Sequence, residues 1–326
     1  MLLAVYRFFI SQMNRESDLI SLSTIPTAPA GFKSGFVGII GRTNVGKSTL
    51  MNQLVEKEIA ITSPISQTTR NRLRGIITTK EAQIILVDTP GIHKPHHQLG
   101  KILVQNAKFA INSVDIVLFI VDSSVPAGGG DHYVAELLRT SPNPVILGLN
   151  KTDKQPSDYH LLDKSYLTLA LPYDWPVIKF SALTGEGLKP LQKALINHLT
   201  PGPYYYPPNL VTDQPEHFIM GELIREQILH KTSQEIPHSV AVVIEKVKET
   251  SNITCVFAAI NVERDSQKGI IIGKKGNMLK AIGSAAREQI QKLIMGEVYL
   301  KIFVKVKPKW RQSSLCLSEF GYRFES

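Results

Sequence analysis

A glycine-rich segment that ends in Lys and Ser is the part of the chain best suited to phosphate chemistry. Residues 41–48 read Gly-Arg-Thr-Asn-Val-Gly-Lys-Ser, follow the apolar run Phe36–Ile40 and open a predicted helix. Glycines let backbone N–H groups wrap a phosphate at the positive end of that helix. A turn without function is the alternative, and the strand before it disfavours that interpretation. The segment predicts a P-loop with contacts from Gly41, Arg42, Thr43, Asn44, Val45, Gly46, Lys47, Ser48 and Thr49.

Side chains in and after this loop are suited to binding Mg²⁺. Lys47 is expected to reach the β- and γ-phosphates, and Ser48 is expected to bind the metal ion. Asp88 follows the apolar run Gln83–Val87 and would hold Mg²⁺ through a water molecule. The turn Asp-Thr-Pro-Gly adds contacts from Thr89, Pro90 and Gly91, the last through a backbone N–H that senses the γ-phosphate.

A hydroxyl that senses the nucleotide state is predicted between these two motifs. Residues 67–71 read Gln-Thr-Thr-Arg-Asn, and a threonine hydroxyl there would bind Mg²⁺ until hydrolysis releases it. Such a release is an order–disorder switch. We favour Thr69 over Thr68 for this role.

Two later motifs select the base. Residues 150–153 read Asn-Lys-Thr-Asp and follow the run Pro144–Leu149, at the sheet edge where α/β proteins bind ligands. The Asp153 carboxylate can accept from guanine N1 and N2, whereas adenine presents an acceptor at N1. Asn150 and Lys151 would hold the base and its loop. A backbone N–H to guanine O6 would come from the segment Ser181, Ala182 and Leu183. These motifs predict GTP and GDP as ligands.

Short β-rich runs that alternate with helical stretches must position these motifs. This alternation predicts an α/β fold with a mostly parallel sheet covered on both faces. Four prolines within residues 201–208 then interrupt the chain. We therefore expect an N-terminal arm at 1–34, a GTPase domain at 35–200, a Pro/Tyr-rich linker at 201–215 and a small α+β domain at 216–326.

The last domain carries a second phosphate-binding pattern. Residues 273–276 read Gly-Lys-Lys-Gly and lie directly before the predicted helix Asn277–Ile294. A Gly-x-x-Gly turn between helices matches the KH loop that clamps a single-stranded backbone. Further basic residues follow on a predicted strand at Val298–Val306. The candidate RNA-binding residues are Gly273, Lys274, Lys275, Gly276, Lys305 and Lys307.

The composition of the chain excludes several classes of protein and favours a partner that carries phosphate. The chain has 326 residues, a net charge of +9 and two cysteines. Eight of those net positive charges lie after residue 266, which suits a phosphate-bearing partner. No uncharged apolar run approaches the ~18 residues of a membrane span. Two cysteines also exclude a disulfide framework and a four-thiolate zinc site, and a reducing compartment fits.

Together the motifs resemble the translation-factor-type branch of P-loop GTPases, and specifically the Era family, over nearly everything from Lys33 onward. The resemblance implies a type II KH domain that binds the 3′ end of small-subunit ribosomal RNA and a role in ribosome assembly. It also implies a potassium ion held by Asn44, with catalysis resting on Asn44, Lys47, Thr69 and Gly91. Ile92 stands where Ras-like enzymes have the glutamine that orients water. Thr43 departs from the proline usual in the family.

Two other interpretations remain open at this stage. One is a signalling GTPase whose basic domain contacts a membrane surface or a protein partner, and the Gly273–Gly276 loop argues against it. The other is a binding module with a degenerate nucleotide site, which the complete set of phosphate and Mg²⁺ ligands disfavours. We expect a cytoplasmic monomer, and peripheral contact at the inner face of the cell membrane is compatible with the interpretation as a GTPase that binds ribosomal RNA.

Overall fold

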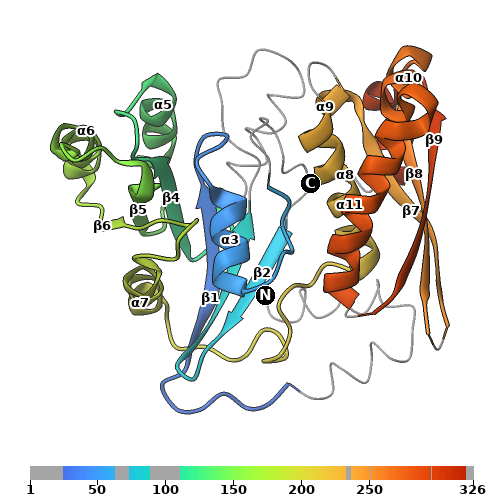
Figure 1. Ribbon diagram of the computed structural model, residues 1–326. Coiled ribbons are helices and arrows are strands. Elements are labelled where there is room, and N and C mark those ends of the chain that lie inside the picture. The colour runs from blue at the N-terminus through green and yellow to red at the C-terminus, as the bar shows by residue number, and fades with distance from the viewer. Residues whose placement is uncertain are drawn as a thin grey trace.

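A six-stranded sheet and a three-stranded sheet, each with its own helices, lie side by side (Figure 1). The computed structural model describes residues 25–62, 73–88, 111–232, 236–250, 252–294 and 296–320. The strands of the first sheet are β1 (Lys33–Ile40), β2 (Leu73–Thr78), β3 (Ala82–Asp88), β4 (Ile116–Asp122), β5 (Val145–Asn150) and β6 (Val177–Lys179). Their spatial order is β2-β3-β1-β4-β5-β6, and only β2 runs antiparallel to its neighbour.

Helices cover both faces of this sheet. The helices are α3 (Lys47–Val55), α5 (Gly129–Leu138), α6 (His160–Ala170) and α7 (Leu188–His198), with short 3₁₀ turns η1 (Thr152–Lys154) and η2 (Leu171–Tyr173). Apolar residues of α3 and α7 pack in one core, and those of α5 and α6 pack in the other. Buried strands with continuous apolar runs are what a two-sided parallel sheet requires. The predicted mostly parallel α/β sheet is therefore confirmed.

The strand order reverses between β1 and β4, because the chain goes from β1 to one side of the sheet and from β4 to the other. Ligands of open α/β sheets bind at such a switch point, beyond the carboxyl ends of the strands. The P-loop follows β1, and residues 150–153 begin at the end of β5. The topology thus brings the predicted phosphate and guanine motifs to one edge.

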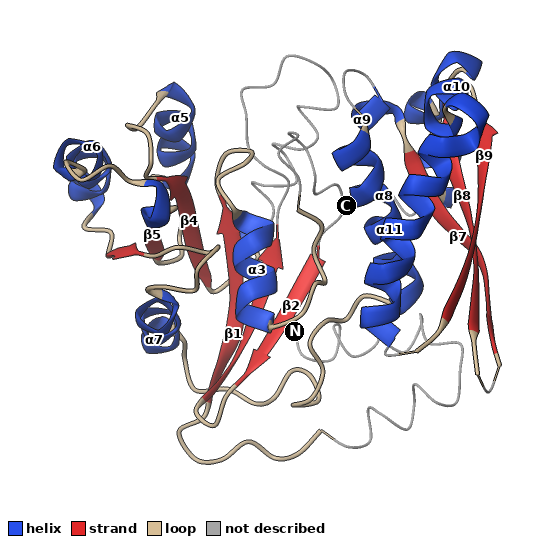
Figure 2. Ribbon diagram, in the orientation of Figure 1, coloured by secondary structure: helices blue, strands red, loops and turns tan. Residues whose placement is uncertain are grey.

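The second sheet has the order β7-β8-β9, with β8 antiparallel to β7 and parallel to β9. Its elements are α8 (Glu216–Lys231), α9 (Ile236–Ser239), β7 (Ala241–Glu249), β8 (Thr254–Val262), α10 (Asp265–Ile272), η3 (Lys274–Gly276), α11 (Asn277–Ile294), β9 (Val298–Val306), η4 (Trp310–Gln312) and α12 (Ser314–Glu319). Helices α8 and α11 lie on one side of the sheet (Figure 2). No described helix is long and apolar enough to cross a membrane.

The proline- and tyrosine-rich segment docks onto the first sheet. The Gln83 side chain, fully buried on β3, accepts from the backbone N–H groups of Tyr205 and Tyr206 and donates to the Tyr206 carbonyl. Arg74 on β2 forms an ion pair with Asp213 at 2.6 Å. The linker therefore has specific partners rather than acting as a loose tether.

Candidate functional site

The P-loop backbone adopts a shape that only glycine allows at two positions. Gly46 has φ 98°, and a Cβ added there would lie 2.3 Å from Asn150 Nδ2. A Cβ added at Gly41 would lie 2.3 Å from the Ile120 carbonyl oxygen at the end of β4. Both glycines are therefore required by close packing of the loop against neighbouring strands.

Lys47 lies inside the loop, where its charge is only partly compensated. The buried Nζ donates to the Arg42 carbonyl at 2.8 Å and to the Gly41 carbonyl at 3.3 Å. Burial lowers the pKa of the Lys47 ammonium to about 8, and nearby Asp88 offsets only part of that shift. An anion placed in the loop would restore the charged form, as expected of a phosphate site.

Hard oxygen ligands lie beside this lysine. The Ser48 hydroxyl donates to Asp88 Oδ2 at 3.2 Å, and Asp88 is fully buried at the end of β3. A hydroxyl and a carboxylate at this spacing fit Mg²⁺, which is held by few protein oxygens and completes its shell with water and phosphate. The other predicted contacts, Thr69, Thr89, Pro90 and Gly91, lie outside the described residues.

Asn150 joins the phosphate loop to the guanine loop. Its Nδ2 donates to the Val45 carbonyl at 2.7 Å, and its Oδ1 accepts from the Ala182 backbone N–H at 2.9 Å. Asp153 accepts from the Ser181 hydroxyl at 2.6 Å. The buried amide therefore acts as a scaffold, and the Asp153 carboxylate lies beside the 181–183 segment in the arrangement expected for a guanine site.

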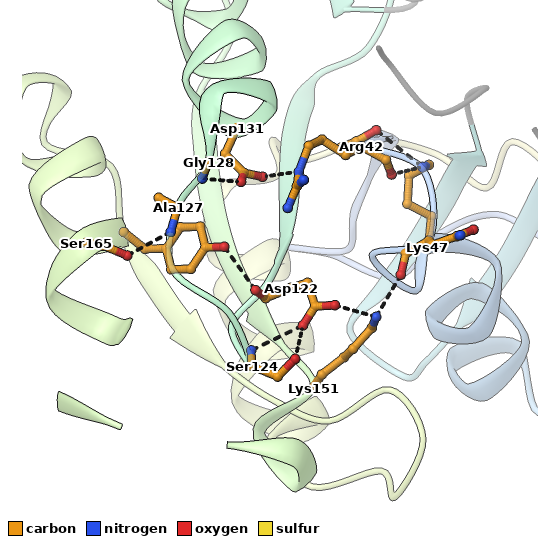
Figure 3. Close-up of polar contacts among 12 residues, drawn as sticks. Arg42, Lys47, Asp122, Ser124, Ala127, Gly128, Asp131, Lys151 and Ser165 are labelled. Carbon is orange, nitrogen blue, oxygen red and sulfur yellow. Dashed lines mark hydrogen bonds and ion pairs between the residues drawn. The ribbon is translucent and has the colours of Figure 1, made fainter. Parts of the chain in front are cut away.

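Lys151 connects the same two loops from the solvent side (Figure 3). Its Nζ donates to the Asn44 carbonyl at 2.7 Å and pairs with Asp122, the last residue of β4. Burial alone would raise the pKa of Asp122, but hydrogen bonds from Lys151 and Ser124 outweigh it, so this pKa lies below its usual value. The exposed Asn44 has φ 63°, a left-handed conformation that Asn adopts more readily than most residues.

Sequence reasoning missed two carboxylates that support the loop. Asp122 is one, and its place at the end of a buried strand is a signal shared with Asp88. The other is Asp131 of α5, which is fully buried and pairs with Arg42 Nε at 2.7 Å (Figure 3). Asp131 also accepts a hydrogen bond from the Gly128 backbone N–H. The same carboxylate therefore caps α5 and anchors the P-loop through Arg42.

The Gly-x-x-Gly turn lies between α10 and α11, as predicted from the sequence. Gly273 and Gly276 have φ 70° and 78°. A Cβ added at Gly273 would lie 2.6 Å from Met278 Cβ, so that glycine is fixed by packing as well as by its φ. Lys274 and Lys275 are exposed within the turn. Two charged side chains on a tight backbone loop suit the phosphates of a single strand.

The other candidate RNA-binding lysines have protein partners. Lys305 pairs with Glu245 of β7, and Lys307 pairs with Glu319 of α12 at 2.9 Å. These pairs are solvent-exposed and therefore weak, so a phosphate can compete for either lysine. Trp310 is 2% exposed and its indole N–H donates to the Ser239 carbonyl, so this ring packs in the core and does not stack on a base.

A polar contact at Thr62 links the two units. Glu226 of α8 accepts from the Thr62 backbone N–H at 2.6 Å and from the Thr62 hydroxyl at 3.1 Å. The Thr62 carbonyl lies 2.9 Å from His230 Nε2. On its other side Glu226 accepts from Gln289 of α11 at 2.7 Å. Thr62 immediately precedes residues 63–72, which include the predicted switch threonine.

Comparison with known proteins gives consistent results across the chain. A family model described as a 50S ribosome-binding GTPase matches residues 36–151, and a KH domain model matches residues 235–311. GTPase Era of Rippkaea orientalis is 76% identical over 96% of this chain and 100% of its own length. GTPase Era of Synechocystis sp. is 68% identical with the same coverage.

Solved structures agree with these relatives. A crystal structure of Era in complex with MgGDPNP and nucleotides 1506–1542 of 16S ribosomal RNA is 35% identical, with a TM-score of 0.84. The match covers 89% of this chain and 99% of that one. A structure of an Aquifex aeolicus Era variant bound to GDP and AlF₄⁻ matches with the same score.

Proposed function

The chain belongs to the Era family of GTPases, and on that basis we propose that it acts on small-subunit ribosomal RNA during assembly of the 30S ribosomal subunit. It is a GTPase that converts GTP to GDP and phosphate. Its second unit is a KH domain. The nucleotide state would control how firmly that domain holds the RNA.

The double hydrogen bond of Asn150 is the observation that carries the nucleotide half of this proposal. Because one buried amide bonds both Val45 and Ala182, the phosphate loop and the guanine loop keep a fixed spacing. Lys47 would place its ammonium on the β- and γ-phosphates, and Asp153 would bind the guanine edge. Preorganised charge of this kind is the main protein contribution to phosphoryl transfer.

Two cations fit the chemistry of this site. Ser48 and Asp88 would hold Mg²⁺, which supplies positive charge to the phosphates when bound. We propose that Asn44 adds a potassium ion, because it lies exposed on the phosphate loop and its side-chain amide oxygen is a ligand type that a weakly hydrated monovalent cation accepts. Ile92 offers no hydrogen bond to water, so another source of transition-state charge is needed.

The RNA half can be tested by crosslinking the chain to cellular RNA, with GTP or GDP bound, and sequencing the recovered RNA. We expect the 3′ end of the small-subunit ribosomal RNA to dominate, and its yield to differ between the two nucleotides. Recovery of unrelated RNA with both nucleotides would contradict the proposed function.

The rival signalling function predicts a different partner. A membrane-bound GTPase would float with anionic vesicles even when RNA is in excess, because its lysines would be engaged by lipid. We propose instead a monomer that works in the cytoplasm, where ribosomal subunits assemble, with any membrane contact displaced by RNA. A vesicle flotation assay with and without the RNA distinguishes the two.

A further inference from the structure

The three-stranded sheet of the KH domain has one face against the helices and one face toward solvent. Along β9, Leu300, Ile302 and Val304 pack in the core with α8 and α11. The alternate residues of this strand therefore point to the opposite, open face. Figure 2 shows both helices on the same side of the sheet.

Aromatic rings occupy the open face without taking part in the core. Tyr299 is 50% exposed and Phe303 is 41% exposed, two of the larger apolar side chains left in solvent. In the parallel register with β8, Tyr299 pairs with Cys255 and Phe303 pairs with the small Ala259. The side chains beside the two rings on β8 are small, so the rings project beyond them and present their surfaces to solvent.

Lysines surround these rings. Lys301 lies between them on β9, with its Nζ 5.2 Å from the centroid of Phe303. Across the sheet, a bulge between Ile244 and Lys246 brings Lys246 and Lys248 opposite Phe257 and Cys255 of β8. Both lysines are exposed.

A fourth lysine on this face, Lys305, pairs with Glu245. Of these four lysines, Lys305 is the one that forms an ion pair with another described residue. The open face combines stacking surfaces with a surplus of positive charge.

We propose that this open face is a second RNA-binding surface, on which single-stranded bases stack on Tyr299 and Phe303 while the lysines contact the phosphates. The inference rests on the proposed function, because the Gly273–Gly276 clamp must first deliver the strand. Tyr299 and Phe303 are four residues apart on the strand, about 13 Å, so each ring would take a separate base of a splayed strand, with Lys301 between them. Stacking of this kind tolerates any base and works with a basic groove.

The other classes of partner fit this face less well. Protein interfaces are depleted of lysine at their centres, whereas Lys301 lies between the two rings. Membrane-surface binding favours an amphipathic helix that can sink into the headgroups, and a sheet face held by three strands has no such freedom. RNA is therefore the occupant with the best charge and shape match.

The experiment measures the affinity of the wild-type chain and of one variant for two RNAs of different length. The first probe is 16S ribosomal RNA spanning nucleotides 1506–1542, and the second is a hexamer from its 3′ end, long enough only for the four-nucleotide clamp. The variant carries Tyr299→Ile and Phe303→Ile, which replace the rings by β-branched side chains that favour a strand. We expect the long RNA to bind about tenfold more weakly or worse, since each stacked base contributes substantially. Hexamer affinity should stay within twofold.

Controls separate the possible failures. Tyr205→Ile removes an exposed aromatic ring from the linker and should change neither affinity. Thermal unfolding followed by circular dichroism reports that the KH domain of each variant is folded. If the variant loses affinity equally for both RNAs, or loses none for either, the proposal of a second RNA-binding surface is wrong. If the wild-type chain binds neither RNA, the proposed function itself fails. If the variant no longer binds phosphatidylglycerol vesicles but binds the long RNA with wild-type affinity, the face binds membrane and the proposal is wrong.

Discussion

At the scale of single residues, the nucleotide site depends on a few side chains that each hold two loops. Asn150 and Lys151 both reach back to the P-loop, Asp122 holds Lys151, and Asp131 holds Arg42 of the loop itself. The motif residues follow from spacing along the chain. Their supporting carboxylates do not, because Asp131 pairs with Arg42 across 89 positions and belongs to no local pattern.

Base selection is expected to reside in Asp153. Asp153→Asn should shift preference from GTP to xanthosine triphosphate, because xanthine has a carbonyl where guanine has its N2 amine. Loss of the charge-assisted hydrogen bonds should cost about 1.5–3 kcal/mol of GTP binding. Competition titrations with both nucleotides measure the change, and unchanged GTP affinity would remove Asp153 from the site. The hydrogen bond from Ser181 tolerates an amide oxygen, so folding should persist.

The potassium proposal concerns Asn44. We expect slow hydrolysis in the absence of RNA, faster turnover in K⁺ than in Na⁺, and loss of that difference in Asn44→Ala. The backbone carbonyl of Asn44 still accepts from Lys151 in the variant, but Ala is strained at a φ of 63°, so the GDP affinity of the variant is measured as a control for the shape of the loop. Phosphate release in matched chloride salts is the measurement, and equal rates for the wild-type chain in both salts contradict the role.

Lys47 makes nucleotide binding depend on pH. Its pKa is about 8 in the nucleotide-free site, and bound phosphates should raise it. Binding must then take up protons near pH 8, so GDP affinity should fall as pH rises above that value, by up to about tenfold per unit. Calorimetry in two buffers of different ionisation enthalpy measures the uptake. Lys47→Arg, which stays charged, should show none.

At the scale of elements, the long periodic segments were predictable and the irregular ones were not. Helix α11 and strand β9 occupy the predicted residues. Apolar residues recur with a helical period along α11, and along β9 buried or partly buried residues alternate strictly with exposed ones. Strand β2 was missed, since Leu73–Thr78 gains its stability from pairing with β3 rather than from its own pattern. The docking of the linker on Gln83 has the same tertiary origin.

Helices α8 and α11 connect the RNA clamp to Thr62, the residue before the predicted switch segment. Helix α11 starts directly after the clamp, its Gln289 bonds Glu226 of α8, and Glu226 holds Thr62. Glu226→Ala should therefore reduce the difference in RNA affinity between the GTP and GDP states. Coupling of this kind is typically about 5- to 150-fold, and we expect most of it to vanish.

The matched control is Glu216→Ala, which removes an exposed carboxylate from the start of the same helix. RNA titrations with each nucleotide bound are the measurement for both variants. Retention of the full nucleotide effect in Glu226→Ala would show that the contact is only structural. Some loss of stability is expected as well, about 1–3 kcal/mol, because the Thr62 N–H loses its acceptor.

At the scale of the whole molecule, the positive charge is concentrated in the KH domain, away from the nucleotide loops. Replacing Lys274 and Lys275 together by Asp should therefore abolish RNA binding and leave GTP affinity intact. The introduced carboxylates repel phosphate, while Gly273 and Gly276 keep the turn geometry. For every phosphate that the variant no longer neutralises, the log–log salt slope should also fall by about 0.7 for a single strand.

Filter binding across a salt series, with nucleotide titration of the same preparation, tests both parts of this prediction. Lys189→Asp together with Lys193→Asp on α7 of the GTPase domain makes the same charge change away from the clamp, and it should leave the slope unaltered. If the Lys274 and Lys275 variant bound RNA with the wild-type affinity and slope, the turn would be structural. The proposed RNA binding by the open face of the sheet would fail as well, because a clamp that does not hold RNA cannot deliver it to that face.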